Sequence, residues 1–536
     1  MAGQREVEGQ APVATAGAPW TVLGRDLARW TPPYAWVVTA LWIAAIGARA
    51  WPLGAPSHDY DEGVYWASLR AMAAGHPLFT SVFSSQPPYF LGGIYPFYLL
   101  LDQSLEAGRV AIVLYSLLGV AAIWLAAWAL GGRWCGALAL ALVAFAPRYL
   151  VESYTLQAEA PSLAFAALSV ALAVCAARQP FGTRRRWLAS AAGVALALGV
   201  AVKLFDVVAL VPVALYLLAP VGPALLDTGG RPRRPERAAL TAGLRAAAPD
   251  LVWAGGGAAV ALALALLPFA GRWPALYDQV IRFHLAAGRV TGQSFADRLG
   301  VIFGSGSDLP LLALALALAA VALARRWWLA LPPAAWLAGS LILLALQRPL
   351  LDHHLALLVP PAALTIAAAV AAAYAEWRAA TPAARQGTLD LLARGSAGAA
   401  LLAALLGAAI GLNGVRHAAL AANHTLGPAF ILAAATAPDD LVVADDQYLV
   451  GLADRDVPPE LVDTSFVRVQ AGYLSAARLE AAAARPEVRA VVFYSGRFDR
   501  VPGFRAWVAA HFVLARTFGP GQALYLKLPH GAPQPA

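Results

Sequence analysis

The chain has 536 residues, of which 60% are hydrophobic and 13% are charged. Apolar stretches long enough to cross a bilayer recur along most of it, which excludes a soluble globular protein and predicts a polytopic helical membrane protein. The net charge of +8 comes mainly from arginines in short loops. This is typical of cytoplasmic loops, and we expect no nucleic-acid partner. The two cysteines, Cys135 and Cys175, indicate neither a disulfide framework nor a metal site.

The chain begins with a polar segment, residues 1–32, that lacks a cleavable signal sequence and is expected to be a flexible cytoplasmic tail. After it, the hydrophobic pattern predicts about eleven spans of roughly 20 residues. Arginines precede the first span and follow the fourth, sixth, eighth and tenth, which places these loops in the cytoplasm. An odd number of spans then places the C-terminal region outside. The spans are expected at 33–51, 108–130, 134–150, 157–177, 187–202, 204–220, 250–269, 309–324, 328–346, 355–375 and 396–413.

An acidic cluster opens the first outer loop, residues 52–107. Directly after the first span come His58, Asp59, Tyr60, Asp61 and Glu62. Ionisable groups at a membrane boundary are costly, so they are candidates for function. The simpler interpretation is a solvated loop whose acids cap the next helix. The rest of the loop is rich in aromatic residues and proline, as in segments that lie in the interface plane.

Further ionisable residues are expected on the same face of the membrane, at the outer ends of later spans. A cavity there would hold carboxylates for base catalysis or metal binding and cations for a phosphate. Simpler roles also exist: Glu159 can cap a helix dipole, and Lys203 can extend to the interface. The adjacent histidines lack the i, i+4 spacing of a helical metal site. These residues are Glu152, Glu159, Lys203, Asp206, Arg282, His284, Arg348, His353 and His354.

After about residue 415 the composition changes to that of a small soluble α/β domain of roughly 100 residues. Strands are expected at 441–444, 490–494 and 523–528, with an alanine-rich helix at 475–485. No glycine-rich phosphate loop opens this region, so we expect no nucleotide site. The predicted organisation is therefore a tail (1–32), a transmembrane domain (33–414) and an extracytoplasmic α/β domain (415–536).

The order of these motifs resembles that of the membrane glycosyltransferases of the C superfamily (GT-C), in particular the protein O-mannosyltransferases and the lipid A aminoarabinose transferases. The resemblance covers the chain to about residue 413. It differs from the family pattern at Glu159, where relatives often have Asp, and near the tenth span, where histidine stands in place of tyrosine. The motifs are the acids at 59–62, Thr155–Pro161, Val202–Leu204, and Asp352–Leu355 followed by Pro360 and Pro361.

The resemblance implies a GT-C-like fold and a sugar donor carried on polyprenyl phosphate. Transfer would occur at the outer face of the membrane, to a lipid, glycan or protein acceptor. The abundance of alanine, glycine and arginine is typical of a GC-rich bacterial genome, so we expect the bacterial cytoplasmic membrane and contact with its lipids.

Such a transfer needs a base for the acceptor and cations for the donor phosphate. Asp59 is the expected base, with Asp61, Glu62 and Glu159 as further catalytic candidates. The expected phosphate-binding residues are Lys203, Arg348, His353 and His354. Other cavity candidates are His58, Tyr60, His284 and Arg282. If a divalent metal ion takes part, Asp59, Glu159 and His284 are its candidate ligands by residue type.

Two other classes of protein share some of these features. A polyprenyl-lipid or polysaccharide transporter also has many spans and buried charge, and a membrane scaffold also carries a soluble domain. Transporters tend to show repeated halves, and the sequence has no clear internal repeat. The dense acids of the first outer loop do not help the scaffold interpretation.

Overall fold

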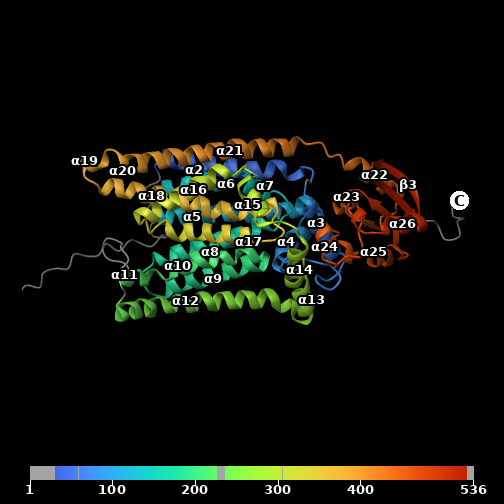
Figure 1. Cartoon of the computed structure of the whole chain (residues 1–536), viewed down its shortest axis with the longest axis horizontal. Helices are drawn as coiled ribbons and strands as arrows, with labels where there is room; N and C mark the ends of the chain where they lie inside the picture. The colour runs from blue at the N-terminus through green and yellow to red at the C-terminus, as the bar shows by residue number, and fades with distance from the viewer. Residues whose placement is uncertain (1–30, 58, 226–233, 235, 305, 528–536) are drawn as a thin grey trace, which may run out of the picture.

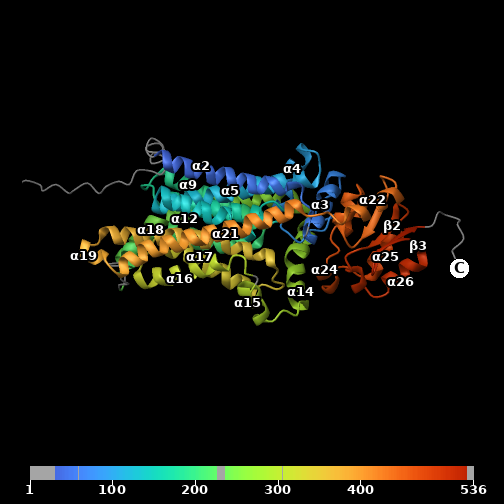
Figure 2. The same cartoon turned by 90° about the horizontal axis from the view of Figure 1, so that it is seen from above.

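The computed structural model describes residues 31–57, 59–225, 234, 236–304 and 306–527. His58 and nearly all of the predicted tail, residues 1–32, lie outside this range. Within it, the chain is mostly helical, with one small sheet. Figures 1 and 2 show an elongated molecule in which the long helices run along the long axis and the sheet lies at one end.

Seven helices among the described residues are long and apolar enough to cross a membrane. A bent pair, α15 (Phe295–Gly304) and α16 (Leu309–Arg325), forms an eighth if it is one span. These segments coincide with eight of the predicted spans, and the predicted spans at 134–150, 204–220 and 328–346 fall on shorter apolar helices. The count of eleven is therefore not confirmed. The seven helices cover Pro32–Gly54, Leu105–Gly131, Glu159–Ala177, Thr183–Val202, Arg237–Val290, Asp352–Ala379 and Thr388–Leu420.

The predicted span at 134–150 shows why the pattern of hydrophobicity was insufficient. This stretch folds as two helices, α6 (Arg133–Ala144) and α7 (Pro147–Glu152). Proline has no backbone N–H and fixes its own φ, so it suits the first turn of a helix and not the interior. Pro147 accordingly begins α7, and the break places Glu152 at the end of a short separate helix.

The membrane helices pack closely through small residues. The helix α9 (Thr183–Val202) lies between α8 (Glu159–Ala177) and α12 (Arg237–Leu266). A Cβ atom added at Gly193 would lie 1.9 Å from the carbonyl oxygen of Ala254, and one at Gly257 would lie 2.4 Å from that of Ser190. Since lipid gives helices no hydrophobic drive to associate, such close backbone approach is a main source of their packing energy.

The remaining helical segments up to the sheet are shorter or continue these helices. They are η1 (Trp51–Gly54), α3 (Tyr60–Ala73), α4 (Tyr89–Leu100), α5 (Leu105–Gly131), η2 (Leu204–Ala209), α10 (Leu210–Leu217), η3 (Ala219–Val221), α11 (Gly222–Leu225), η4 (Leu267–Arg272), α13 (Trp273–Tyr277), η5 (Asp278–Arg282), α14 (Phe283–Val290), α17 (Leu331–Leu346), η6 (Asp352–Leu358), α18 (Val359–Ala379), α19 (Pro382–Arg385), α20 (Thr388–Asp390), η7 (Leu391–Gly395), α21 (Ser396–Leu420) and α22 (Leu426–Ala435), with α2 (Pro32–Ala50) at the start.

The C-terminal sheet has the strand order β1-β2-β4-β3. The strands β1 (Leu441–Ala444) and β2 (Val488–Phe493) are parallel, and β4 (Gln522–Lys527) is antiparallel to both β2 and β3 (Phe512–Gly519). The predicted strands at 441–444, 490–494 and 523–528 are confirmed, and β3 was missed. The predicted helix at 475–485 is confirmed as α25. The helical segments here are α23 (Gln447–Leu452), η8 (Pro459–Leu461), α24 (Phe466–Gln470), α25 (Ala476–Ala483), η9 (Phe498–Arg500) and α26 (Phe504–His511).

The C-terminal part packs directly on the helix α3 of the first loop. A Cβ atom at Gly63 would lie 2.7 Å from the backbone nitrogen of Tyr448, and one at Gly451 would lie 2.4 Å from the ring of Trp66. At the other end of α3, Arg70 forms an ion pair with Asp456 at 2.7 Å. The acids at the start of α3 therefore lie where the helical and α/β parts meet.

Candidate active site

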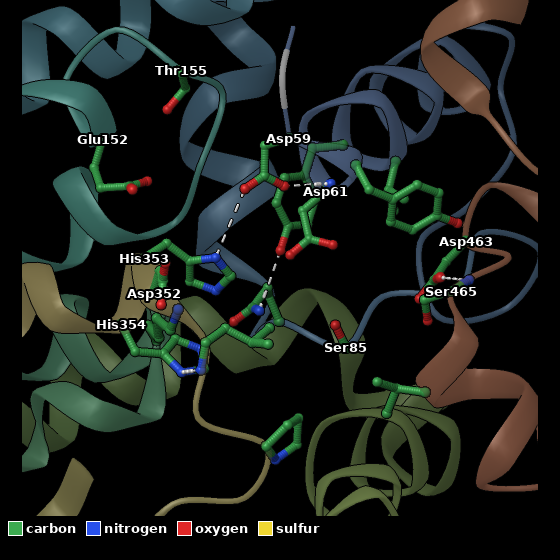
Figure 3. Close-up of a pocket in the computed structure, with 18 of the residues that line it drawn as sticks. Asp59, Asp61, Ser85, Glu152, Thr155, Asp352, His353, His354, Asp463 and Ser465 are labelled. Atoms are coloured by element: carbon green, nitrogen blue, oxygen red, sulfur yellow. Dashed lines mark hydrogen bonds and ion pairs between the residues drawn. The ribbon is translucent and has the colours of Figure 1, made fainter. Parts of the chain in front are cut away.

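A cavity of about 710 Å³ collects most of the ionisable residues that the sequence analysis selected. It lies between the start of α3, the adjoining ends of several membrane helices and the loop that leads into α24 of the C-terminal part (Figure 3). Apolar side chains such as Val64, Phe205 and Phe283 form much of its wall. The segments that line it fall within 55–65, 85–87, 109, 148–155, 203–205, 283–287, 343–354, 418, 463–467 and 497.

Asp59 is accessible from the cavity, with 39% of its side chain exposed. It is the N-cap of α3, where its Oδ1 accepts the backbone N–H of Asp61 at 2.8 Å. Its Oδ2 lies 3.9 Å from Nδ1 of His353. The capping role predicted as the simpler interpretation is therefore real. It occupies one oxygen and leaves the other facing the cavity, as Figure 3 shows.

Asp61 lines the cavity and lies between Asp59 and the C-terminal Asp463 in the view of Figure 3. Burial raises the pKa of its carboxyl to about 8, with further contributions from the negative charges of Asp59, Asp463 and Glu159. Lys203 acts in the opposite direction. At neutral pH Asp61 is therefore mostly protonated and can donate a hydrogen bond, which a carboxylate cannot do.

Glu62 is turned away from the cavity. Its carboxylate is fully buried and accepts two hydrogen bonds from Arg109, at 2.8 and 2.7 Å, and one from the backbone N–H of Leu156 at 2.7 Å. Burial by itself raises its pKa, but Arg109 outweighs burial and the net pKa is lowered. This carboxylate is fixed in an internal ion pair, so the structure does not bring Glu62 to the reacting side of α3.

Glu159 and Lys203 form a buried ion pair at the membrane side of the cavity. The Nζ of Lys203 contacts Oε1 of Glu159, and Nε2 of His353 lies 3.6 Å from the same oxygen. The other oxygen, Oε2, is buried and has no hydrogen-bond partner. Lys203 lines the cavity, so it is more than a snorkelling residue. Glu159 stands at the start of α8, as a dipole cap would, but it is also bound to this charged group.

The residues that could hold a metal ion in the structure differ from the predicted set. Glu159, His353 and His354 each offer a ligand atom within 4.8 Å of the others. Leu351 donates its backbone N–H to Nδ1 of His354 at 3.2 Å, which leaves Nε2 as the available nitrogen. Two imidazole nitrogens and a carboxylate are a ligand set that suits zinc-like divalent ions, and the unpartnered Oε2 of Glu159 supports the fit. Of the predicted set, His284 is not in this group; its Nδ1 donates to the Val280 carbonyl at 2.8 Å.

The other predicted residues divide between the cavity and the surface. Tyr60 and His284 line the cavity. Arg348 is exposed and is not among the lining residues. Arg282 is also exposed and faces Asp278 at 3.5 Å. Arg282 ends the short helix η5 and Arg348 lies in a loop, and the direction of neither side chain follows from the sequence pattern.

Sequence reasoning missed several charged lining residues, among them Arg148, Asp463 and Arg497. Arg148 is the second residue of α7, and an arginine within an apolar run on the outer side was a usable signal. The other two come from loops of the C-terminal part and reach the cavity only because that part packs on α3. Glu152 also lines the cavity, with Oε2 buried and unpartnered. Burial, with the charges of Glu159 and Asp59, raises its pKa well above the usual range.

Comparison with known proteins agrees with this architecture. Residues 85–253 match the family model described as dolichyl-phosphate-mannose-protein mannosyltransferase. The fold is similar to crystal structures of ArnT from Cupriavidus metallidurans, one of them bound to undecaprenyl phosphate. It is also similar to archaeal oligosaccharyltransferase AglB from Archaeoglobus fulgidus in complex with an inhibitory peptide and a dolichol-phosphate. The chain has the fold of the GT-C membrane glycosyltransferases.

These similarities extend over nearly the whole chain at low sequence identity. The ArnT complex has a TM-score of 0.57 and 14% identity over 96% of this chain and 99% of that chain. The unliganded ArnT has 0.56 and 15% over 94% and 98%. AglB has 0.55 and 12% over 94% and 75%. No curated protein sequence matches significantly. The GT-C resemblance predicted from the sequence is thus confirmed for the fold.

Proposed function

We propose that this protein transfers a sugar from a polyprenyl-phosphate donor to a lipid, glycan or protein acceptor at the outer face of the bacterial cytoplasmic membrane. The observation that carries the proposal is a single cavity that combines an accessible carboxylate (Asp59), a buried ammonium group (Lys203) and an apolar wall. The GT-C neighbours support it, since the ArnT structure holds undecaprenyl phosphate and the AglB structure holds dolichol-phosphate.

The proposed step is an inverting displacement at the anomeric carbon of the donor. The acceptor oxygen or nitrogen attacks that carbon and gives its proton to Oδ2 of Asp59. The bond between the anomeric carbon and the phosphate oxygen breaks, and polyprenyl phosphate leaves with its negative charge. Such a leaving group needs no general acid, unlike the alcohol released in glycoside hydrolysis. Lys203 and Arg148 supply positive charge on the cavity wall to stabilise it.

The roles of the neighbouring groups follow from their surroundings. His353, with Nδ1 3.9 Å from Asp59 and Nε2 3.6 Å from Glu159, joins the base to the ion pair. Asp61, protonated at neutral pH, would donate a hydrogen bond to a sugar or acceptor oxygen. A divalent ion, if it binds, would be held by Glu159, His353 and His354, where it would supply positive charge for a phosphate. Glu62 acts in this scheme only by holding α3 against Arg109.

The chain would be oriented with its N-terminus in the cytoplasm and the α/β part, residues 415–536, outside. The cationic loops predicted to be cytoplasmic support this orientation. It puts the cavity and the sheet on the side of the membrane where polyprenyl-linked donors would be used.

The test is sugar transfer by purified protein from undecaprenyl-phosphate sugars, with mass spectrometry of co-purified lipids to identify the carrier. Asp59→Asn keeps the shape and removes the basicity, so turnover should fall by roughly 10²-fold or more. Asp102→Asn is the matched control, because Asp102 is an exposed acid of the same loop outside the cavity. Near-normal turnover in Asp59→Asn would remove Asp59 from the role of base. Lipid movement without transfer from any donor would favour a transporter.

A further inference from the structure

Two loops that are far apart in sequence meet at one side of the cavity through their middle residues. Tyr60 is the middle residue of Asp59–Asp61, and Thr464 is the middle residue of Asp463–Ser465. The backbone N–H of Thr464 donates to Oη of Tyr60 at 2.8 Å, and the two hydroxyl oxygens lie 3.1 Å apart. The outer residues of both triplets line the cavity. The first loop and the C-terminal part are thus joined between their cavity-facing side chains.

The two triplets also share their local geometry. Oδ1 of Asp59 accepts the backbone N–H two residues later at 2.8 Å, and Oδ1 of Asp463 does the same at 2.7 Å. Each turn leaves a second carboxylate oxygen, and the two turns face each other across Asp61 (Figure 3). The charge of Asp463 is near enough to help raise the pKa of Asp61. The distance between the two turns therefore sets the separation of the carboxylates of Asp59, Asp61 and Asp463.

The hydroxyl of Thr464 is completely used. It is fully buried, it accepts from Nε2 of Gln447 at 2.8 Å, and it donates to the carbonyl of Ala444 at 3.2 Å. The remaining lone pair accepts from the hydroxyl of Tyr60, since that hydroxyl already accepts the backbone N–H. One donor and two acceptors are all that a hydroxyl offers. Because Ala444 ends β1, this network ties Tyr60 to the sheet.

The ring of Tyr60 is fixed as well. The guanidinium carbon of Arg497 lies 3.5 Å from the ring centroid, within the range of a cation–π contact. Nε of Arg497 is buried without a hydrogen-bond partner, so the stacking on Tyr60 is its main described contact at that face. Arg497 follows β2 by a few residues, which gives the sheet a second hold on the same side chain.

We propose that Thr464 and Arg497 are positioning residues, through which the C-terminal part holds Tyr60 and so fixes Asp59 and Asp61 in the cavity. This inference rests on the proposed function for its kinetic consequence but not for its structural one. A displacement of catalytic groups by about 1 Å can cost roughly 10²-fold in rate. Loss of the link should therefore lower turnover more than it lowers donor affinity.

The test uses two variants of the full-length protein. Thr464→Val removes the hydroxyl, and Thr464→Ser keeps it. Thr436→Val is the matched control, because Thr436 is also a buried threonine of the C-terminal part. Its hydroxyl accepts a hydrogen bond of 3.0 Å from Arg455, and it does not line the cavity. We expect kcat to fall roughly tenfold or more in Thr464→Val with KM for the donor little changed. Thr464→Ser should retain most of the wild-type kcat, and Thr436→Val should have a kcat near that of the wild type. Tyr60→Phe, which keeps the ring stacking, should lower kcat in the same direction.

A second readout does not depend on catalysis. Hydrogen exchange of the backbone amides of residues 59–66 should speed up in Thr464→Val and not in Thr436→Val. If exchange there is unchanged in folded Thr464→Val, the proposal is overturned, and the same holds if exchange rises but kcat does not fall. If wild-type protein shows no transfer while exchange responds as expected, the positioning of α3 stands and the proposed function fails.

Discussion

The buried pair of Glu62 and Arg109 offers a test of which first-loop acids serve structure. Glu62→Gln keeps the size of the side chain and removes its charge. In the native protein the two side chains are 0% and 1% exposed. Arg109 also donates to the carbonyls of Leu53 and Ala55 at 2.6 Å each. The substitution leaves a buried guanidinium without its counter-charge and turns one accepting oxygen into a donor that faces it.

The expected cost follows from these contacts. Removing one partner of a buried, hydrogen-bonded ion pair typically destabilises a protein by about 3–5 kcal/mol. The two carbonyl bonds of Arg109 remain, which favours the lower end. At roughly 2 °C per kcal/mol, we expect Tm to fall by about 6–10 °C, nearer the lower value. The double variant Glu62→Met with Arg109→Met should be less destabilised than Glu62→Gln, because it leaves no buried unpaired charge.

The assay is thermal unfolding of the detergent-solubilised protein followed by near-ultraviolet circular dichroism. Glu106→Gln is the control, since Glu106 is an exposed acid near Arg109 in the first turn of α5; its Tm should stay within about 1–2 °C of wild type. The pKa of Glu62 is lowered in the folded state. Its stabilisation is therefore present above the unfolded pKa near 4.5 and is lost as the pH falls below that value. An unchanged Tm for Glu62→Gln at pH 7 would refute this reasoning.

Two further predictions concern the cavity. The pKa of Asp61 is about 8 in the folded protein and 3.8 as the ordinary value, so ionisation of Asp61 opposes folding. The free energy of unfolding is therefore not reduced by this group below about pH 4, and it falls progressively as the pH rises to about 8. Asp61→Asn should therefore raise Tm relative to wild type by an amount that grows over this range, and a constant difference would contradict it. Arg148→Gln should weaken binding of undecaprenyl phosphate roughly tenfold, measured by displacement of a labelled lipid. Arg348→Gln, at an exposed position outside the cavity, should leave this affinity unchanged. Equal effects of the two substitutions would show that a place in the cavity wall does not decide which arginine contacts the phosphate.

Much of the membrane architecture was readable from the sequence. Apolar runs are a local property, and in lipid each backbone polar group must be satisfied within its own helix, so span positions follow from composition alone. Eight predicted spans coincide with long apolar helices or the bent pair. The strands β1, β2 and β4 were found for the same reason, because each is a short run of mostly apolar residues, and β1 and β2 are largely buried. The edge strand β3 is mostly exposed and carries no such signal.

The candidate site could be predicted only in part. The acids after the first span and Lys203 were selected because charge is costly at a membrane boundary, and this cost is visible in the sequence. The separate fates of Asp59, Asp61 and Glu62 were not visible. They occupy neighbouring positions of one loop and helix start, and their roles diverge because Glu62 is bound by Arg109 while Asp59 and Asp61 line the cavity.

The tertiary structure alone decided which distant loops complete the cavity. Asp463 and Arg497 lie more than 400 residues beyond Asp59, and no local pattern links them to it. They reach it because small residues, Gly63 and Gly451, let α3 and α23 pack at backbone distance. Local sequence sets which segments are helices, strands or charged. The site depends on side-chain directions and long-range packing, which exist only once the whole chain has found its lowest free energy.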